Sequence, residues 1–305
     1  MSRISQSLST AIFVAAAFGV CAFAQAADVA TKSLEQKTHP QKTSEQKSGE
    51  HKKTARFDTS RCNVPDSLVT QDQSLPRIGF KLRNDLPIKV IAIGSSSTQG
   101  HGASSPSHAY PARLAVELSE LWPRAQLTVI NRGVGGDRTA QMMARFDRDV
   151  LAEKPDLVIW QVGTNDSLAG DTIDSMRELI LEGIDTLEMA GIDVILMSPQ
   201  YAPRFNERAD HLLRVEAVRG TAQEKHIGVF RRFEIMQNWV ARDNMSVAMM
   251  ISNDGLHMND LSYGCKAHLL ARQIATASSA MPSAVQAIAP QATPSAAAIG
   301  PNTLR

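Results

Sequence analysis

The strongest constraint in this sequence is a repeated alternation, between residues 86 and 275, of short apolar runs with longer amphipathic segments. The apolar runs are rich in Val, Ile and Leu, as is typical of strands buried on both faces. The expected strands are residues 88–93, 127–130, 157–162, 192–197 and 227–230. The segments between and after them have the pattern of helices and cover residues 109–122, 139–151, 172–189, 207–225 and 259–275.

Strand–helix alternation of this kind predicts a parallel sheet with right-handed crossover connections. We therefore expect a three-layer α/β/α domain over residues 85–277, built on a mainly parallel five-stranded sheet. The last helix should begin at Asn259 and Asp260, because both residues are suited to cap a helix N-terminus. Ligands in open α/β sheets bind beyond the carboxyl ends of the strands, so the loops at those ends should carry the chemistry.

The two ends of the chain differ from this middle part. Residues 1–26 have the features of a secretory signal peptide, because Arg3 precedes a short apolar run and the small residues Ala24 and Ala26 predict cleavage after Ala26. Residues 27–84 are expected to be a disordered, Lys-rich tether and lead-in, and residues 278–305 a disordered Ala/Pro-rich tail. The sequence therefore predicts a periplasmic or secreted protein.

Removal of the signal peptide leaves two cysteines, Cys62 and Cys265. In an exported protein such a pair is a candidate disulfide, which here would join the lead-in segment to the last helix. The alternative is that the two cysteines remain separate thiols, and the sequence does not choose between a disulfide and free thiols.

Composition excludes several classes of protein. Hydrophobic residues make up 43% of the 305 residues and charged residues 21%, which excludes a wholly disordered or fibrous chain. A net charge of +1 argues against a nucleic-acid partner, which normally requires a basic surface. No apolar run reaches the length of a membrane span, so no stable membrane insertion is expected.

Glycine and polar residues cluster where the predicted strands end. Residues 94–100 (GSSSTQG) follow the first strand, 131–137 (NRGVGGD) the second and 163–166 (GTND) the third, and 254–257 (DGLH) precede the last helix. These loops lack the Lys of a phosphate-binding loop and the final Gly of a dinucleotide fingerprint. The histidines are scattered and no paired cysteines occur, so we expect neither a cofactor nor a metal ion.

Nucleophilic acyl transfer fits these loops better. A serine nucleophile needs a base to take its proton, and the base needs an acid to orient it. Asp254 and His257 are three residues apart on a turn, so the carboxylate can hold one ring nitrogen while the other faces a serine. Taken singly, each residue has an ordinary structural interpretation: Ser96 as a turn or helix-cap residue, Gly136 as a turn glycine and Asn165 as a loop cap. Their occurrence together with His257, in this order along the chain, favours catalysis.

In these four blocks the chain resembles the SGNH hydrolase family, also called GDSL-type esterases. The resemblance implies a flavodoxin-like fold, with Ser96 as the nucleophile and Asp254 and His257 completing a catalytic triad. It also implies an oxyanion hole formed by Ser96, Gly136 and Asn165. One departure is that Ser95 stands where the family has an Asp before the nucleophile.

The resemblance therefore implies an exported serine esterase that hydrolyses short-chain, acetyl esters through an acyl-enzyme on Ser96. Its substrate would be a small ester or an acylated saccharide. Two alternatives stay open, namely an SGNH-type O-acyltransferase acting on envelope polysaccharide and a non-catalytic glycan-binding module. Tyr201 and Arg204, after the fourth predicted strand, are interpreted as ordinary loop packing. The sequence does not give the oligomeric state.

Overall fold

The computed structural model describes residues 57–70, 73–206 and 208–280, which fold around a five-stranded sheet with the strand order β2-β1-β3-β4-β5. All four pairs of neighbouring strands are parallel, as the strand–helix alternation predicts. The carboxyl ends of all five strands therefore meet at one edge of the sheet. The strands are β1 Ile88–Gly94, β2 Leu127–Gly133, β3 Leu157–Gln161, β4 Asp193–Met197 and β5 Gly228–Phe230.

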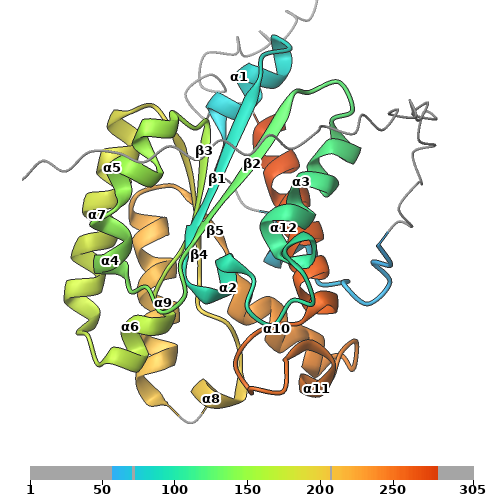
Figure 1. The fold of residues 1–305 in the computed structure, drawn as a ribbon, viewed down its shortest axis with the longest axis vertical. Helices are drawn as coiled ribbons and strands as arrows, with labels where there is room; N and C mark the ends of the chain where they lie inside the picture. The colour runs from blue at the N-terminus through green and yellow to red at the C-terminus, as the bar shows by residue number, and fades with distance from the viewer. Residues whose placement is uncertain (1–56, 71–72, 207, 281–305) are drawn as a thin grey trace, which may run out of the picture. The chain divides into compact units, whose positions relative to one another are not determined.

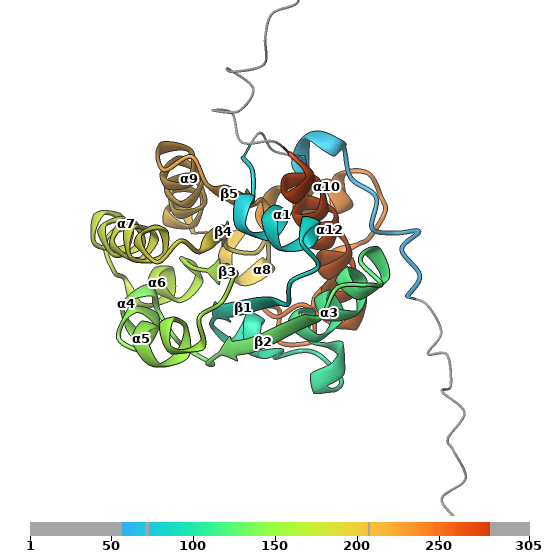
Figure 2. The same ribbon diagram turned by 90° about the horizontal axis from the view of Figure 1, so that it is seen from above.

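Helices cover both faces of the sheet, which confirms the predicted α/β architecture (Figures 1 and 2). One layer consists of α1 Pro76–Arg83, α3 Tyr110–Leu121, α10 Arg232–Ala241 and α12 Asp260–Ser279. The other consists of α4 Thr139–Met143, α5 Phe146–Asp149, α7 Ile173–Met189 and α9 Ala209–Glu224. Four short helices lie in loops near the carboxyl ends of the strands: α2 Ser96–Gln99, α6 Thr164–Ala169, α8 Pro203–Asn206 and α11 Val247–Met250.

Each face of the sheet has its own apolar core, because successive strand residues point to opposite faces. Val90 and Ile159 pack toward α3 and α12, whereas Ile91 and Trp160 pack toward α7. A side chain at Gly183 would approach the Trp160 ring to 2.4 Å, so this glycine lets α7 lie close to β3. These two cores fix the strand ends that carry the site.

Part of the segment expected to be disordered is folded. Residues 57–70 and 73–84 contain α1 and a short 3₁₀ helix, Asp66–Leu68, and they bury apolar side chains such as Leu75 and Ile78. The boundary expected at residue 85 is therefore too late. At the other end, α12 continues to Ser279, past the expected boundary at 277. Residues 1–56 and 281–305, with the predicted signal peptide and most of both predicted disordered segments, lie outside the described residues.

The helix expected over residues 139–151 is also different. It is broken into α4, α5 and the 3₁₀ turn Leu151–Glu153, with the first break at Ala144 and Arg145. Met142, Phe146 and Val150 are all buried, and this four-residue spacing produced the helical pattern. The break turns Arg145 inward, where it is 8% exposed.

A disulfide joins Cys62 to Cys265, which settles the pairing that the sequence left open. Both cysteines are buried, and the bond fastens the segment before α1 to α12. Asn259 caps α12 by accepting a hydrogen bond from the Ser262 N–H at 3.3 Å, as expected from its residue type. Across the part of the chain that the structure describes, no helix is long and apolar enough to span a membrane.

Candidate active site

Ser96 is the first residue of α2 and follows the end of β1 after a single residue. The side chain of Gln161, the last residue of the neighbouring strand β3, holds the turn between β1 and α2. Its side-chain oxygen accepts hydrogen bonds from the Ser95 N–H at 2.9 Å, the Ser95 hydroxyl at 3.0 Å and the Thr98 hydroxyl at 3.2 Å. A side chain at Gly94 would collide with Thr98 at 2.2 Å, so the turn requires glycine there. Ser95, at the position of the family's Asp, is thus buried and fully used in fixing the turn.

The structure brings together the three side chains expected to form a triad. The Ser96 Oγ lies 2.8 Å from the His257 Nε2, although the two residues are 161 positions apart in the chain. The His257 Nδ1 in turn lies 2.5 Å from an oxygen of Asp254. The imidazole is 11% exposed and the carboxylate 44%, so the relay opens to solvent on the Asp254 side.

Several hydrogen bonds orient the Asp254 carboxylate. Its Oδ2 faces the imidazole, and its Oδ1 accepts from the backbone N–H groups of Leu256 and His257, both at 2.9 Å, and from the Ser252 hydroxyl at 2.8 Å. Burial raises the pKa of Asp254, but the hydrogen bonds from His257, Leu256 and Ser252 outweigh it and hold the pKa well below its usual range. The group is therefore a fixed negative charge that selects the tautomer with a proton on Nδ1.

The glycine-rich loop, residues 133–137, begins at the last residue of β2. It packs against the turn that carries Ser96, residues 94–98, which is the nucleophile turn. A side chain at Gly133 would come within 2.1 Å of the Gln99 nitrogen, and one at Gly135 would lie 4.0 Å from the Ser96 Cβ. Gly136 has a φ of +85°, a left-handed conformation that favours glycine. Within the described residues its N–H donates to no backbone acceptor. Gly136 directly follows Gly135, which lies beside Ser96, so its N–H is a candidate oxyanion donor. The N–H of Ser96, at the first position of α2, is a second candidate.

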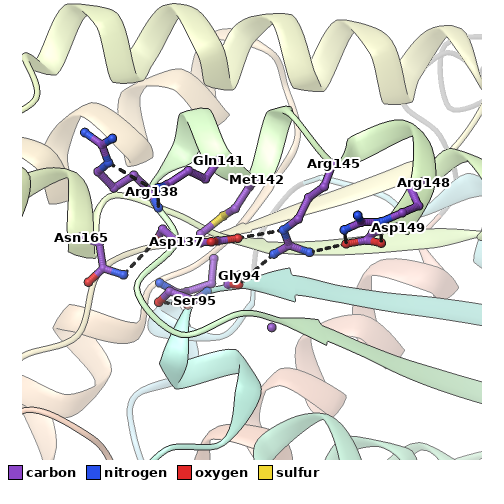
Figure 3. A network of polar contacts seen from close by, with 12 residues as sticks. Gly94, Ser95, Asp137, Arg138, Gln141, Met142, Arg145, Arg148, Asp149 and Asn165 are labelled. Carbon is purple, nitrogen blue, oxygen red and sulfur yellow. Dashed lines mark hydrogen bonds and ion pairs between the residues drawn. The ribbon is translucent and has the colours of Figure 1, made fainter. Parts of the chain in front are cut away.

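Asn165 is the second residue of α6 and supplies the third predicted donor. Its Nδ2 donates to the backbone oxygen of Asp137 at 2.9 Å, which uses one of its two hydrogens (Figure 3). Because Asp137 follows Gly136 directly, this bond places the amide next to the Gly136 loop. Asp166 fixes the same corner by accepting from the N–H groups of Thr139 at 3.0 Å and Gly163 at 3.2 Å.

Sequence reasoning missed several residues of this site. His101, in the loop after α2, has its ring centroid 5.2 Å from that of His257, and Gln161 and Arg145 support the surrounding loops. The sequence carried no signal for His101, because a lone histidine in a loop is usually a surface residue. Tyr201 packs edge-on against Phe233 with ring centroids 5.5 Å apart, which agrees with ordinary loop packing.

The arrangement contains the parts needed for acyl transfer: a serine, a base that contacts it, an acid that orients the base, and nearby N–H donors. Among the residues that the structure describes, no group of three or more His, Cys, Asp or Glu side chains is placed to hold a metal ion.

Comparison with known proteins identifies the family. The sequence profile of the non-GDSL lipase-like family matches residues 61–280, which is most of the chain and includes all four motif blocks. The chain belongs to the non-GDSL lipase-like family. The family assignment agrees with the SGNH resemblance, and the matched range begins close to Cys62, well before the boundary expected from sequence.

Relatives of this family member include esterases. It is 31% identical over 98 residues to an acetylxylan esterase of Geobacillus stearothermophilus, an overlap of 30% of this chain and 45% of that one. In structure it is similar to a two-domain esterase active on acetylated mannans, with a TM-score of 0.60 and 19% identity over 72% of this chain and 58% of the other.

A protein of the G-D-S-L family from Desulfitobacterium hafniense is also similar in structure. Its TM-score is 0.51 and its identity 25%, over 61% of this chain and 98% of that one. The two structural likenesses together confirm the predicted SGNH fold. The chain spans about half the length of the curated relatives it matches.

Proposed function

We propose that this protein is an exported serine esterase that removes acetyl groups from carbohydrate through an acyl-enzyme on Ser96. The observation that carries the proposal is the continuous relay from the Ser96 hydroxyl through His257 to Asp254, with contacts of 2.8 and 2.5 Å. Such a relay activates a serine that would otherwise be a weak nucleophile.

In the first step, the His257 Nε2 takes the Ser96 hydroxyl proton as the Oγ attacks the ester carbonyl carbon. The negative charge that develops on the carbonyl oxygen is received by the N–H groups of Ser96 and Gly136 and by the remaining N–H of the Asn165 amide. The bond between the acyl carbon and the sugar oxygen then breaks, and the imidazolium gives its proton to the departing sugar oxygen. Asp254 stabilises the imidazolium throughout this step.

In the second step, water hydrolyses the acyl-enzyme. His257 takes a proton from the water as its oxygen attacks the acyl carbon, and it then returns that proton to the Ser96 Oγ as the ester bond to the enzyme breaks. The products are the free serine hydroxyl and acetic acid, which releases its remaining proton to solvent as acetate. The same donors stabilise both tetrahedral intermediates, because the reacting carbonyl oxygen stays in one place.

Acetylated saccharides are the proposed substrates because two of the relatives named above act on acetylated polysaccharide. Export is supported by the Cys62–Cys265 disulfide, since such bonds persist in oxidising compartments. Export also agrees with the signal peptide that the sequence predicts at residues 1–26.

The test is acetate release from acetylated xylan, acetylated mannan and p-nitrophenyl acetate by the purified protein, with Ser96→Ala as the control. We expect release by the wild type, none above background by the variant, and labelling of Ser96 by a fluorophosphonate probe. Absence of both release and labelling would refute the esterase and favour a glycan-binding module. If an added sugar acceptor takes the acetyl group in preference to water, the protein is an acyltransferase instead.

A further inference from the structure

Arg145 makes three hydrogen bonds from a buried guanidinium behind the nucleophile turn (Figure 3). Its Nε donates to the Asp137 carboxylate at 2.8 Å, its Nη1 to the Asp149 carboxylate at 2.8 Å, and its Nη2 to the backbone oxygen of Gly94 at 3.2 Å. The planar guanidinium presents its donors in fixed directions, so it holds these three acceptors in one geometry.

The Gly94 oxygen belongs to the last residue of β1, two positions before Ser96. Besides the Arg145 guanidinium, it accepts the N–H of Val134 at 3.0 Å, which is the point where the glycine-rich loop leaves β2. Arg145 therefore contacts the backbone at the place where the nucleophile turn and the glycine-rich loop are joined.

The Asp137 contact reaches the other side of that loop. Asp137 follows Gly136, and its N–H closes a turn onto the Val134 oxygen at 3.2 Å. Its own backbone oxygen accepts the Asn165 amide at 2.9 Å. Fixing the Asp137 side chain thus restrains a residue that is covalently next to one oxyanion donor and hydrogen-bonded to another.

We propose that Arg145 is a positioning residue for the reaction, which holds the Ser96 turn and the Gly136 and Asn165 donors in register with one another. The inference rests on the proposed function, because register matters only if these donors receive an oxyanion. Donors of this kind act by being fixed in advance at the place where charge develops, so a small misplacement lowers the rate without weakening substrate binding.

A purely structural role for Arg145 would be to hold the corner between α4 and α5. The two carboxylates separate these roles, because both accept from Arg145 at 2.8 Å and both are nearly buried, with side-chain exposures of 13% and 14%. Asp137 lies in the glycine-rich loop, whereas Asp149 lies at the end of α5, where it also binds Arg148. Loss of the Asp149 contact should disturb the corner and leave the bonds of Arg145 to Asp137 and Gly94 in place.

The experiment compares Asp137→Asn with its matched control Asp149→Asn, by the kcat and KM for p-nitrophenyl acetate and by the Tm. We expect Asp137→Asn to lower kcat roughly 10- to 100-fold with KM within about twofold, because a contact used only in the transition state is weakened. Asp149→Asn should keep kcat within about threefold of wild type while its Tm falls at least as much.

Arg145→Lys is the second variant, because a single ammonium group cannot reproduce the fork that reaches both Asp137 and the Gly94 oxygen. Its kcat should fall about as far as that of Asp137→Asn. If Asp137→Asn does not fold, the comparison is made between the kcat values of Arg145→Lys and Asp149→Asn. Equal effects on kcat at the two carboxylates, or a normal kcat in Arg145→Lys, would overturn the positioning role alone. A wild-type protein without esterase activity would overturn the proposed function and this inference with it.

Discussion

Replacing Asp254 by asparagine should damage the proposed catalysis more than replacing it by alanine. The asparagine oxygen would occupy the Oδ1 position, because three donors, the N–H groups of Leu256 and His257 and the Ser252 hydroxyl, converge there at 2.8–2.9 Å. The amide NH₂ would then face the His257 Nδ1 and require it to accept. The proton would move to Nε2, which could no longer take the proton of Ser96.

The sizes of the two effects follow from what each variant loses. Asp254→Ala loses a hydrogen bond to a charged partner, worth about 1.5–3 kcal/mol, and the 44% exposure of the carboxylate places the effect toward the lower end. At about 1.4 kcal/mol for each factor of ten, the rate should fall roughly 10- to 100-fold. Asp254→Asn adds the wrong tautomer, which costs about 10⁴-fold in a serine protease with the same substitution.

The assay is kcat/KM for p-nitrophenyl acetate at pH 7.5, with the folded state of each variant checked by its Tm. Asp260→Asn is the matched control, because Asp260 is a carboxylate of similar exposure, 40%, that lies 3.5 Å from His108 and accepts from Ser104 outside the relay. It should change kcat/KM less than about threefold. An alanine variant as slow as the asparagine variant, or slower, would refute the tautomer argument.

Three further outcomes are expected. Asn165→Ala should lower kcat about 10²–10³-fold with little change in KM, because one proposed oxyanion donor is lost; an effect confined to KM would contradict that role. Replacing Cys62 and Cys265 by serine should cost roughly 2–5 kcal/mol of stability, which calorimetry would register as a Tm lower by about 2–4 °C for each kcal/mol; an unchanged Tm would show that the bond adds nothing. Burial raises the pKa of Asp193 from 3.8 to about 6, so the stability it contributes is complete below about pH 4 and is lost as the pH rises through 6. Asp193→Asn should therefore flatten the change in unfolding free energy over that range in urea titrations, and an identical pH slope would exclude the effect.

The sheet and its motif loops could be predicted because buried parallel strands leave a direct trace in the sequence. β3 and β4 are buried at every residue and match the expected apolar runs to within one residue at each end. β2 extends to Gly133, three residues past the expected end. It lies at the edge of the sheet, where polar residues such as Asn131 and Arg132 are tolerated, so an apolar pattern ends too early there.

The features that were missed depend on contacts distant in sequence. α1 begins without a capping side chain of its own, because Asp193, more than a hundred residues away, accepts the N–H groups of Arg77 and Ile78. Arg145 falls inside the helix expected over residues 139–151, and nothing local signals the break that turns it inward. By contrast, the contact between Ser96 and His257 could be predicted because the residues of each motif are adjacent in the chain.

The Cys62–Cys265 bridge spans 203 positions, and this has a consequence for biosynthesis. A growing polypeptide delivers Cys62 long before its partner, so the bond can form only after all five strands have been synthesised. The bridge therefore cannot guide early assembly. A chain truncated before Cys265 cannot form the bond, so its Cys62 keeps a free thiol. That thiol distinguishes it chemically from a chain that includes Cys265.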